Sequence, residues 1–201
     1  MTVETRPEQK PPPVPRRAPS RLVWLAAVGM LLALVVFPVF ASTYFIGAFT
    51  EIMILAIFAL SLGFLMGYPR LVSLGHAAFF GGGAYAAGIL AVRLEVTNLF
   101  VTLAVGLIFA ALLSLVIGGL SLRSTGIYFL MITLALAQMV YVVAQQWNSV
   151  TGGTDGLAGV PYPELFGVLE FDRVGFYYLV LALAAGSYLL LRSVTRSPFG
   201  Q

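Results

Sequence analysis

The chain has 201 residues, of which 60% are hydrophobic and only 9% are charged, and its formal net charge is +3. A soluble domain usually carries about 25% charged residues, so this composition predicts lipid as the main solvent. The chain has no cysteine and one histidine, which excludes disulfides, thiolate chemistry and multi-histidine metal sites. We therefore expect no metal and no cofactor. We interpret the positive charge as basic residues that orient the chain in a membrane, and not as a sign of binding to nucleic acid.

Residues 1–21 form a separate region that contains six prolines and almost no bulky apolar side chain. This composition predicts a disordered, Pro/Arg-rich cytoplasmic tail, followed by a transmembrane domain over residues 22–201. A secretory signal cleaved after Val39-Phe40-Ala41 is an alternative. The apolar run before that point is longer than a typical signal core, which favours a membrane span.

Six apolar stretches follow in chain order, each near the roughly 20 residues that a helix needs to cross a bilayer. They are Leu22–Phe40, Ile46–Met66, Leu74–Val92, Leu99–Leu122, Ile127–Trp147 and Val174–Leu191. The third stretch is short and glycine-rich, so it is either a span or a re-entrant segment. The expected fold is an all-α, polytopic transmembrane helical bundle with about six spans.

The basic residues test this topology independently. With six spans and a cytoplasmic N-terminus, nine of the eleven basic residues lie inside, and only Arg93 and Arg173 lie outside. This asymmetry predicts N-in, C-in topology, although five spans give a nearly similar count of eight against three. The longest outside segment, residues 148–173, is rich in glycine and proline. A loop of this length usually has a function or packs as a cap over the bundle.

The segment Gly67–Gly75 is predicted to be a cytoplasmic turn that leads into the third stretch, with Ser73 capping the next helix. Arg70 is interpreted as a topology anchor. His76 is expected one turn inside that helix, where it is either a hydrogen-bonded structural residue or a ligand for a substrate carboxylate.

Small residues recur at four-residue spacing in the third stretch. The pairs are Ala77 and Gly81, Gly83 and Ala87, and Ala84 and Gly88. This spacing lets another helix approach closely, and ordinary tight packing is the favoured interpretation. On this reasoning Gly83→Leu should prevent assembly.

Two features are candidates for a substrate pathway. Glu51 is the only acidic residue in an apolar stretch, and it either lines the pathway or reaches interfacial water. In the fifth stretch, Gln138, Tyr141 and Gln145 fall on one broad helical face. That face either lines a polar pathway or makes hydrogen bonds between helices. We find no nucleotide-binding motif, catalytic triad or paired carboxylates, so the sequence gives little support to an enzyme.

Three blocks in order, GYPRLVSLGHAAFFGGGAYAAG, LRSTGIYFLMITLALAQM and TGGTDGL, resemble the LivM-type permeases of branched-chain amino acid ABC importers. The same superfamily includes permeases for urea and short amides. Where the family usually has Ala-Gly-Gln after Gly-Tyr, this chain has Pro69-Arg70-Leu71. The residues that match the family motifs are Gly67, Tyr68, Ser73, Gly75, His76, Gly83, Tyr85, Gly126, Tyr128, Thr151, Gly152, Gly153, Asp155 and Gly156.

The resemblance implies a permease subunit of the bacterial inner membrane that moves a small polar solute by alternating access. It also implies a paralogous permease partner in a heterodimer, two cytoplasmic ATPase subunits and a periplasmic substrate-binding protein. In the family, SPFG opens a cytoplasmic coupling loop, so Ser197–Gly200 suggests the N-terminal portion of a longer permease. The alternatives are a secondary transporter or channel, or a fragment that does not transport.

Overall fold

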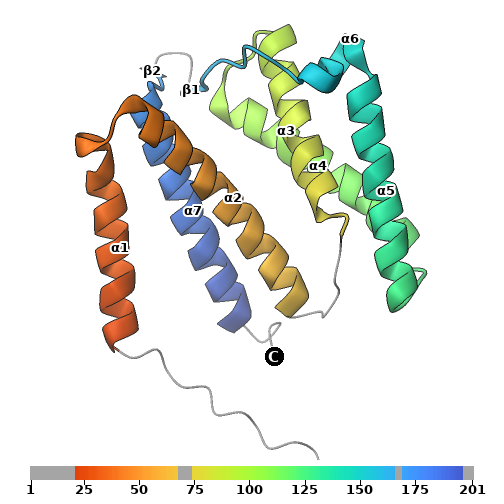
Figure 1. Ribbon diagram of the computed structural model, residues 1–201, viewed down its shortest axis with the longest axis horizontal. Coiled ribbons are helices and arrows are strands. Elements are labelled where there is room, and N and C mark those ends of the chain that lie inside the picture. Colours follow the sequence, from red (N-terminus) through yellow and green to blue (C-terminus); the bar gives the residue numbers. More distant parts are fainter. Residues whose placement is uncertain (1–20, 68–73, 166–168, 197–201) are drawn as a thin grey trace, which may run out of the picture. The chain divides into compact units, whose positions relative to one another are not determined.

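The computed structural model of the protein describes residues 21–67, 74–165 and 169–196 (Figure 1). The chain separates into two compact units, residues 1–40 and residues 41–201. In the first unit the described residues form one helix, α1 (Arg21–Phe40), with Pro38 near its end. The predicted tail lies outside the described residues, except that Arg21 already belongs to the helix.

Helices α2 (Thr43–Gly67) and α7 (Arg173–Arg196) lie side by side in the second unit, although they come from opposite ends of it (Figure 1). Buried residues recur on them at spacings of three or four: Ile46, Thr50 and Met53 on α2, and Tyr177, Val180 and Leu181 on α7. This spacing places the buried side chains of each helix on one face, as helix packing requires.

Helices α3 (His76–Arg93), α4 (Leu99–Ser121) and α5 (Ile127–Gln146) contact one another and form a second group of long helices in this unit. A short turn joins α3 to α4, and Asn98 caps α4 by accepting a hydrogen bond from the backbone N–H of Phe100 at 3.0 Å. This cap satisfies one of the amide donors that a helix N-terminus leaves unpaired.

The segment after α5 folds over one end of these three helices. It contains α6 (Asn148–Thr151), a 3-10 turn η1 (Gly153–Asp155), and two short antiparallel strands, β1 (Glu164–Leu165) and β2 (Leu169–Glu170). The backbone N–H of Glu164 donates to the carbonyl of Thr97 at 2.8 Å, which ties β1 to the turn between α3 and α4. We call residues 148–165 the outer cap, and their contacts favour the packing interpretation of this loop.

All six predicted apolar stretches are helical, which confirms the all-α class of a polytopic membrane protein. Four helices are long and apolar enough to cross a membrane: Thr43–Gly67, Leu99–Ser121, Ile127–Gln146 and Arg173–Thr195. Val28–Phe40 of α1 is also apolar, and α3 is not among the four. The question whether the third stretch spans the bilayer therefore stays open. The two-residue strands were not predicted.

Candidate functional site

His76 forms a side-chain contact between α2 and α3. Its Nε2 atom lies 2.7 Å from Oγ of Ser61 on α2. The Ser61 hydroxyl donates its single hydrogen to the carbonyl of Phe58 at 2.8 Å. Because a hydroxyl has one hydrogen, Ser61 Oγ accepts from Nε2–H when it donates to Phe58, and the role of Nε2 follows the tautomer of the imidazole. The bond fits the structural interpretation of His76. The prediction that His76 lies one turn inside the helix is wrong, since α3 begins at this residue.

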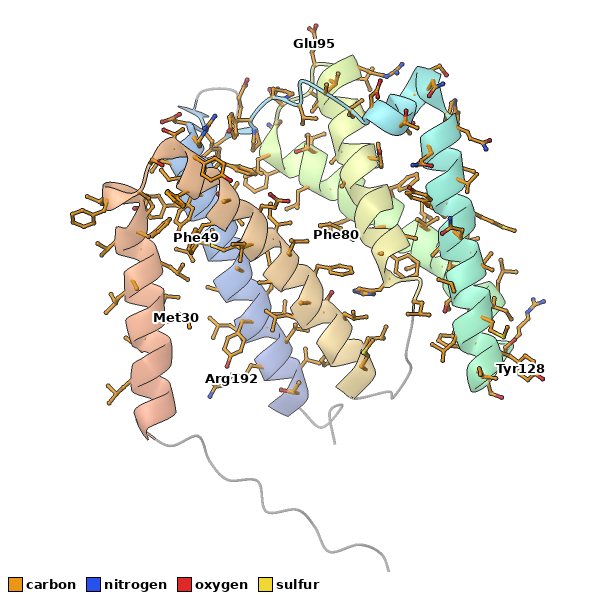
Figure 2. The ribbon with its side chains drawn as sticks, viewed as in Figure 1. Met30, Phe49, Phe80, Glu95, Tyr128 and Arg192 are labelled. Atoms are coloured by element: carbon orange, nitrogen blue, oxygen red, sulfur yellow. The ribbon has the colours of Figure 1, made fainter. Side chains whose placement is uncertain are left out.

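Aromatic rings surround this bond. The ring of Phe58 lies 5.4 Å from the His76 ring and 5.2 Å from the ring of Phe80, centroid to centroid. Phe79 meets the His76 ring edge-on at 6.0 Å. These distances lie in the range of favourable aromatic pairs. We call Phe58, Ser61, His76, Phe79 and Phe80 the aromatic–histidine cluster, and Phe80 is labelled in Figure 2.

Gly83 lies where α3 and α4 approach most closely. A Cβ atom at Gly83 would meet the carbonyl oxygen of Gly106 at 3.0 Å and the Cβ of Ala110 at 3.4 Å. A Cβ at Gly106 would in turn meet the carbonyl oxygen of Gly83 at 3.1 Å and the Cβ of Ala87 at 3.5 Å. We call these four residues the α3–α4 seam. The predicted pair Gly83 and Ala87 therefore faces a matching pair on α4, as close helix packing requires.

The two other predicted pairs do not face a helix in this way. A Cβ at Gly81 would meet nothing within 4 Å, and Ala77 and Ala84 are exposed. Gly88 is buried under the outer cap, where its Cβ would meet the side chain of Leu157 at 3.0 Å. Four-residue spacing thus marks helix contact at only one of the three predicted pairs.

The TGGTDGL motif folds into a compact turn at the start of the outer cap. The hydroxyl of Thr151 lies 2.5 Å from the carbonyl of Ala144 and 2.9 Å from that of Trp147, and it accepts from the N–H of Gly153 at 3.3 Å. Gly152 has φ +80° and Gly153 has φ +63°, a region that favours glycine. Asp155 is exposed, so its carboxylate is accessible at this face of the chain.

Arg93 holds the outer cap to the end of α3. Its guanidinium donates to the backbone carbonyls of Ser149 and of Val150, the latter at 3.2 Å. Arginine suits this role because its planar group offers several donors in fixed directions. The topology prediction used Arg93 only as one of the two basic residues on the outer side of the membrane.

Glu51 is exposed on α2, and it is the only acidic residue in the described α-helices. Among the described residues its carboxylate has no hydrogen bond and no ion pair. A carboxylate that faces lipid is costly, so such a residue normally faces protein or a water-filled route.

The candidate polar face of α5 points away from α3 and α4. Gln138 and Tyr141 are exposed and Gln145 is half-buried, whereas the buried side chains of α5 are Phe129 and Thr133. The side-chain amide of Gln145 donates to the Tyr141 hydroxyl at 2.7 Å. The structure therefore brings two of the three residues together by a bond within the helix, while Gln138 is a separate exposed group.

The remaining motif residues are spread over helix ends and the α3 surface. Gly67 ends α2, the buried Gly75 is the N-cap of α3, and Gly126 precedes α5 with φ +62°. Tyr85 is half-buried, and Tyr128 is exposed at the start of α5 (Figure 2). The other assignments, to Tyr68, Pro69, Arg70, Leu71 and Ser73, lie outside the described residues.

The described residues contain no group of three or more His, Asp or Glu side chains placed to hold a metal ion. Sequence reasoning missed Ser61, Arg93 and Gly106. Gly106 could have been predicted as the packing partner of Gly83, because Gly106 and Ala110 repeat the same four-residue spacing on the next helix. Ser61 is a single hydroxyl in an apolar stretch and gives no such signal.

Comparison with known proteins adds a family and two relatives. Residues 44–201 match the family described as "Branched-chain amino acid transport system / permease component". The chain is 28% identical to the "High-affinity branched-chain amino acid transport system permease protein LivM" of Escherichia coli (strain K12) and 27% identical to the protein of the same name from Salmonella typhimurium. Each match covers 88% of this chain and 47% of the relative, so the chain spans about half the length of these relatives. No solved structure matches.

Proposed function

The chain belongs to the family of branched-chain amino acid transport system permease components, and we propose that it forms part of the permease subunit of an ABC importer. The family match carries this proposal, because it covers α2 to α7 and therefore every described helix of the second unit. As a family member it is a multi-pass protein of the bacterial inner membrane. The proposed cargo is a small polar solute, with branched-chain amino acids first among the candidates.

The proposal assigns the chemistry of energy coupling to partner subunits. We propose two cytoplasmic ATPases, a paralogous permease that forms a heterodimer with this chain, and a periplasmic binding protein that delivers the solute. A solute of this kind does not cross the hydrocarbon core unaided, so it needs a protein-lined route. No catalytic family is indicated by the comparisons.

Two exposed polar regions of otherwise apolar helices are the proposed lining of that route. Glu51 is exposed on α2, and Gln138, Tyr141 and Gln145 lie on the α5 face that no described helix covers. Polar groups at membrane depth are unfavourable against lipid, so these faces should contact the route or the paralogous subunit. The outer cap, with Asp155 exposed, is the proposed docking face for the binding protein.

Transport by reconstituted complexes tests the function. The native complex, with its ATPase and binding-protein partners in proteoliposomes, should accumulate radiolabelled leucine only with ATP. Uptake driven by an ion gradient without any ATPase would replace this proposal with a secondary transporter. A complex that never retains an ATPase would contradict it as well.

The α5 face is tested by two matched substitutions. Gln145→Leu should reduce uptake, because it removes a polar group from the proposed route. Gln146→Leu makes the same chemical change one residue later, about 100° around the helix, and should leave uptake near the wild-type rate. Equal losses in both variants, at equal membrane levels, would remove the α5 face from the route.

A further inference from the structure

The aromatic–histidine cluster joins α2 to α3 through side-chain ends alone. One hydrogen bond links the helices, His76 Nε2 to Ser61 Oγ at 2.7 Å, and the Phe58 ring covers it on one side. The Phe80 ring meets Phe58 at 5.2 Å. One hydrogen bond and a few ring contacts are each worth little, so they separate at a smaller cost in free energy than closely packed helix backbones.

The cluster and Glu51 share one side of α2. Glu51 and Phe58 are seven residues apart, which places them on nearly the same line of the helix, about 10 Å from each other along its axis. Ser61 follows three residues later. Along this side the α2 surface therefore passes from an exposed carboxylate to the aromatic–histidine cluster, whose members are half-buried except for the exposed Phe80.

The predicted topology shows which end of this side of α2, from Glu51 to Ser61, faces the outside of the membrane. We call this side the track. With the N-terminus of the chain inside, α2 begins outside at Thr43 and ends inside at Gly67. Glu51 then lies toward the outer end and Ser61 toward the inner end. His76 is the first residue of α3, so it also lies at the inner end.

We propose that the aromatic–histidine cluster is the inner gate of the solute route whose outer part includes Glu51, a role that rests on the proposed transport function. In the closed state His76 is hydrogen-bonded to Ser61, and Phe58 and Phe80 occlude the track. Opening breaks the His76–Ser61 bond and separates the Phe58 and Phe80 rings. The imidazole and the hydroxyl then become free to hydrogen-bond a passing polar solute.

These 201 residues contain no cysteine, so an introduced thiol is the only one within them, and its modification is read on this chain. Ser61→Cys places a thiol beside His76, and a thiolate and an imidazole together bind Zn²⁺. In the native complex, micromolar Zn²⁺ should bridge the two helices and lower ATP-dependent uptake by about ten-fold or more, with recovery after chelation. Ser114→Cys on α4 is the matched control, since Ser114 bonds only within its own helix, to the Ala111 carbonyl at 2.8 Å. The double variant Ser61→Cys/His76→Ala removes the second ligand and should also resist Zn²⁺.

A second readout does not depend on transport. A water-soluble maleimide should modify the introduced thiol at rates that differ several-fold between the resting complex and the complex trapped with ATP and vanadate. Zn²⁺ should protect the thiol in Ser61→Cys and not in the double variant.

Equal maleimide rates in both states, or Zn²⁺ protection with unchanged uptake, would make the cluster a static contact and overturn the gate. Failure of Zn²⁺ to protect the thiol would overturn the pairing itself. If the wild-type complex moves no amino acid, the transport proposal fails, while the maleimide rates still decide whether the cluster opens.

Discussion

Helix α3 meets α4 and α2 in different ways. Against α4 it presents the α3–α4 seam, where the backbone of Gly83 faces that of Gly106 and a single added carbon would lie 3.0 Å from a carbonyl oxygen. Against α2 it presents the aromatic–histidine cluster, where the contacts are ring edges and one hydrogen bond. The seam leaves little room for movement, because backbone atoms of the two helices are already close to van der Waals contact. The cluster allows movement, because side chains can change rotamer while their helices stay intact.

This difference indicates which parts are held together. The seam ties α3 to α4, and Arg93 with the packing of Leu157 on Gly88 ties α3 to the outer cap. These contacts hold α3, α4 and the outer cap together, whereas the contacts described between α3 and α2 are those of the aromatic–histidine cluster. Four predictions test the contrast.

Gly83→Leu should have the largest effect. The added side chain would force the α3–α4 seam apart, and overpacking of this kind costs about 1–3 kcal/mol or more. Membrane levels should fall sharply, and the thermal midpoint of the complex in detergent should drop. Gly81→Leu is the matched control, since a Cβ at Gly81 meets nothing within 4 Å. Normal levels and normal uptake in Gly83→Leu would refute the close approach.

Gly152→Ala should come next. Gly152 has φ +80°, and a Cβ there would collide with the carbonyl oxygen of Gly156. The outer cap should therefore unfold locally, which limited proteolysis from the periplasmic side would detect. Gly159→Ala carries the same backbone strain at φ +75° without a neighbour, and should cost only about 1 kcal/mol. Equal protease sensitivity of the two variants would show that the turn geometry does not hold the cap.

Arg93→Gln should have a smaller effect, confined to the junction of α3 and the outer cap. It removes the donors to the Ser149 and Val150 carbonyls, so cleavage within residues 148–165 should become several-fold faster while the helices stay folded. Arg173→Gln loses the same charge on the same predicted side of the membrane. If both variants are cleaved at the same rate, charge rather than the hydrogen bonds of Arg93 explains the result.

Ser61→Ala should change stability least. It removes both hydrogen bonds of a half-buried hydroxyl, the one with His76 and the one to the Phe58 carbonyl, each worth about 0.5–1.5 kcal/mol. The thermal midpoint should move only slightly, as for Ser114→Ala, which loses a bond within α4. A loss as large as that of Gly83→Leu would mean that the cluster holds the fold together, and the contrast between the two faces of α3 would disappear.

The positions of the helices could be predicted from the sequence, because bilayer thickness sets the length of an apolar stretch. Gly83 could be predicted as a packing position for a similar reason, since small residues at four-residue spacing allow close approach. The same spacing at Ala77 and Gly81 gave the same signal without a facing helix. Spacing within one helix shows that close packing is possible, but the partner depends on the fold.

The contacts of His76 and Arg93 could not be predicted, because both depend on residues that are distant in the chain. Ser61 lies fifteen residues before His76, and Ser149 lies 56 residues after Arg93. Neither partner belongs to a periodic pattern or to a recognisable motif. Gln138, Tyr141 and Gln145 share one side of α5 because the segment is helical, and α5 packs on α3 and α4 through the opposite side. That this face lines a route stays a prediction.

The modest hydrophobicity of α3 has a consequence for biogenesis. α3 is not among the helices that are apolar enough to cross a membrane by composition, whereas α4 is. Gly83, which makes the seam possible, contributes little apolar surface to α3, as do the other glycines of this helix, and α3 also carries His76 and Arg93. We therefore expect the insertion machinery to retain α3 until α4 has been synthesised, and to release the two helices into lipid as one hairpin.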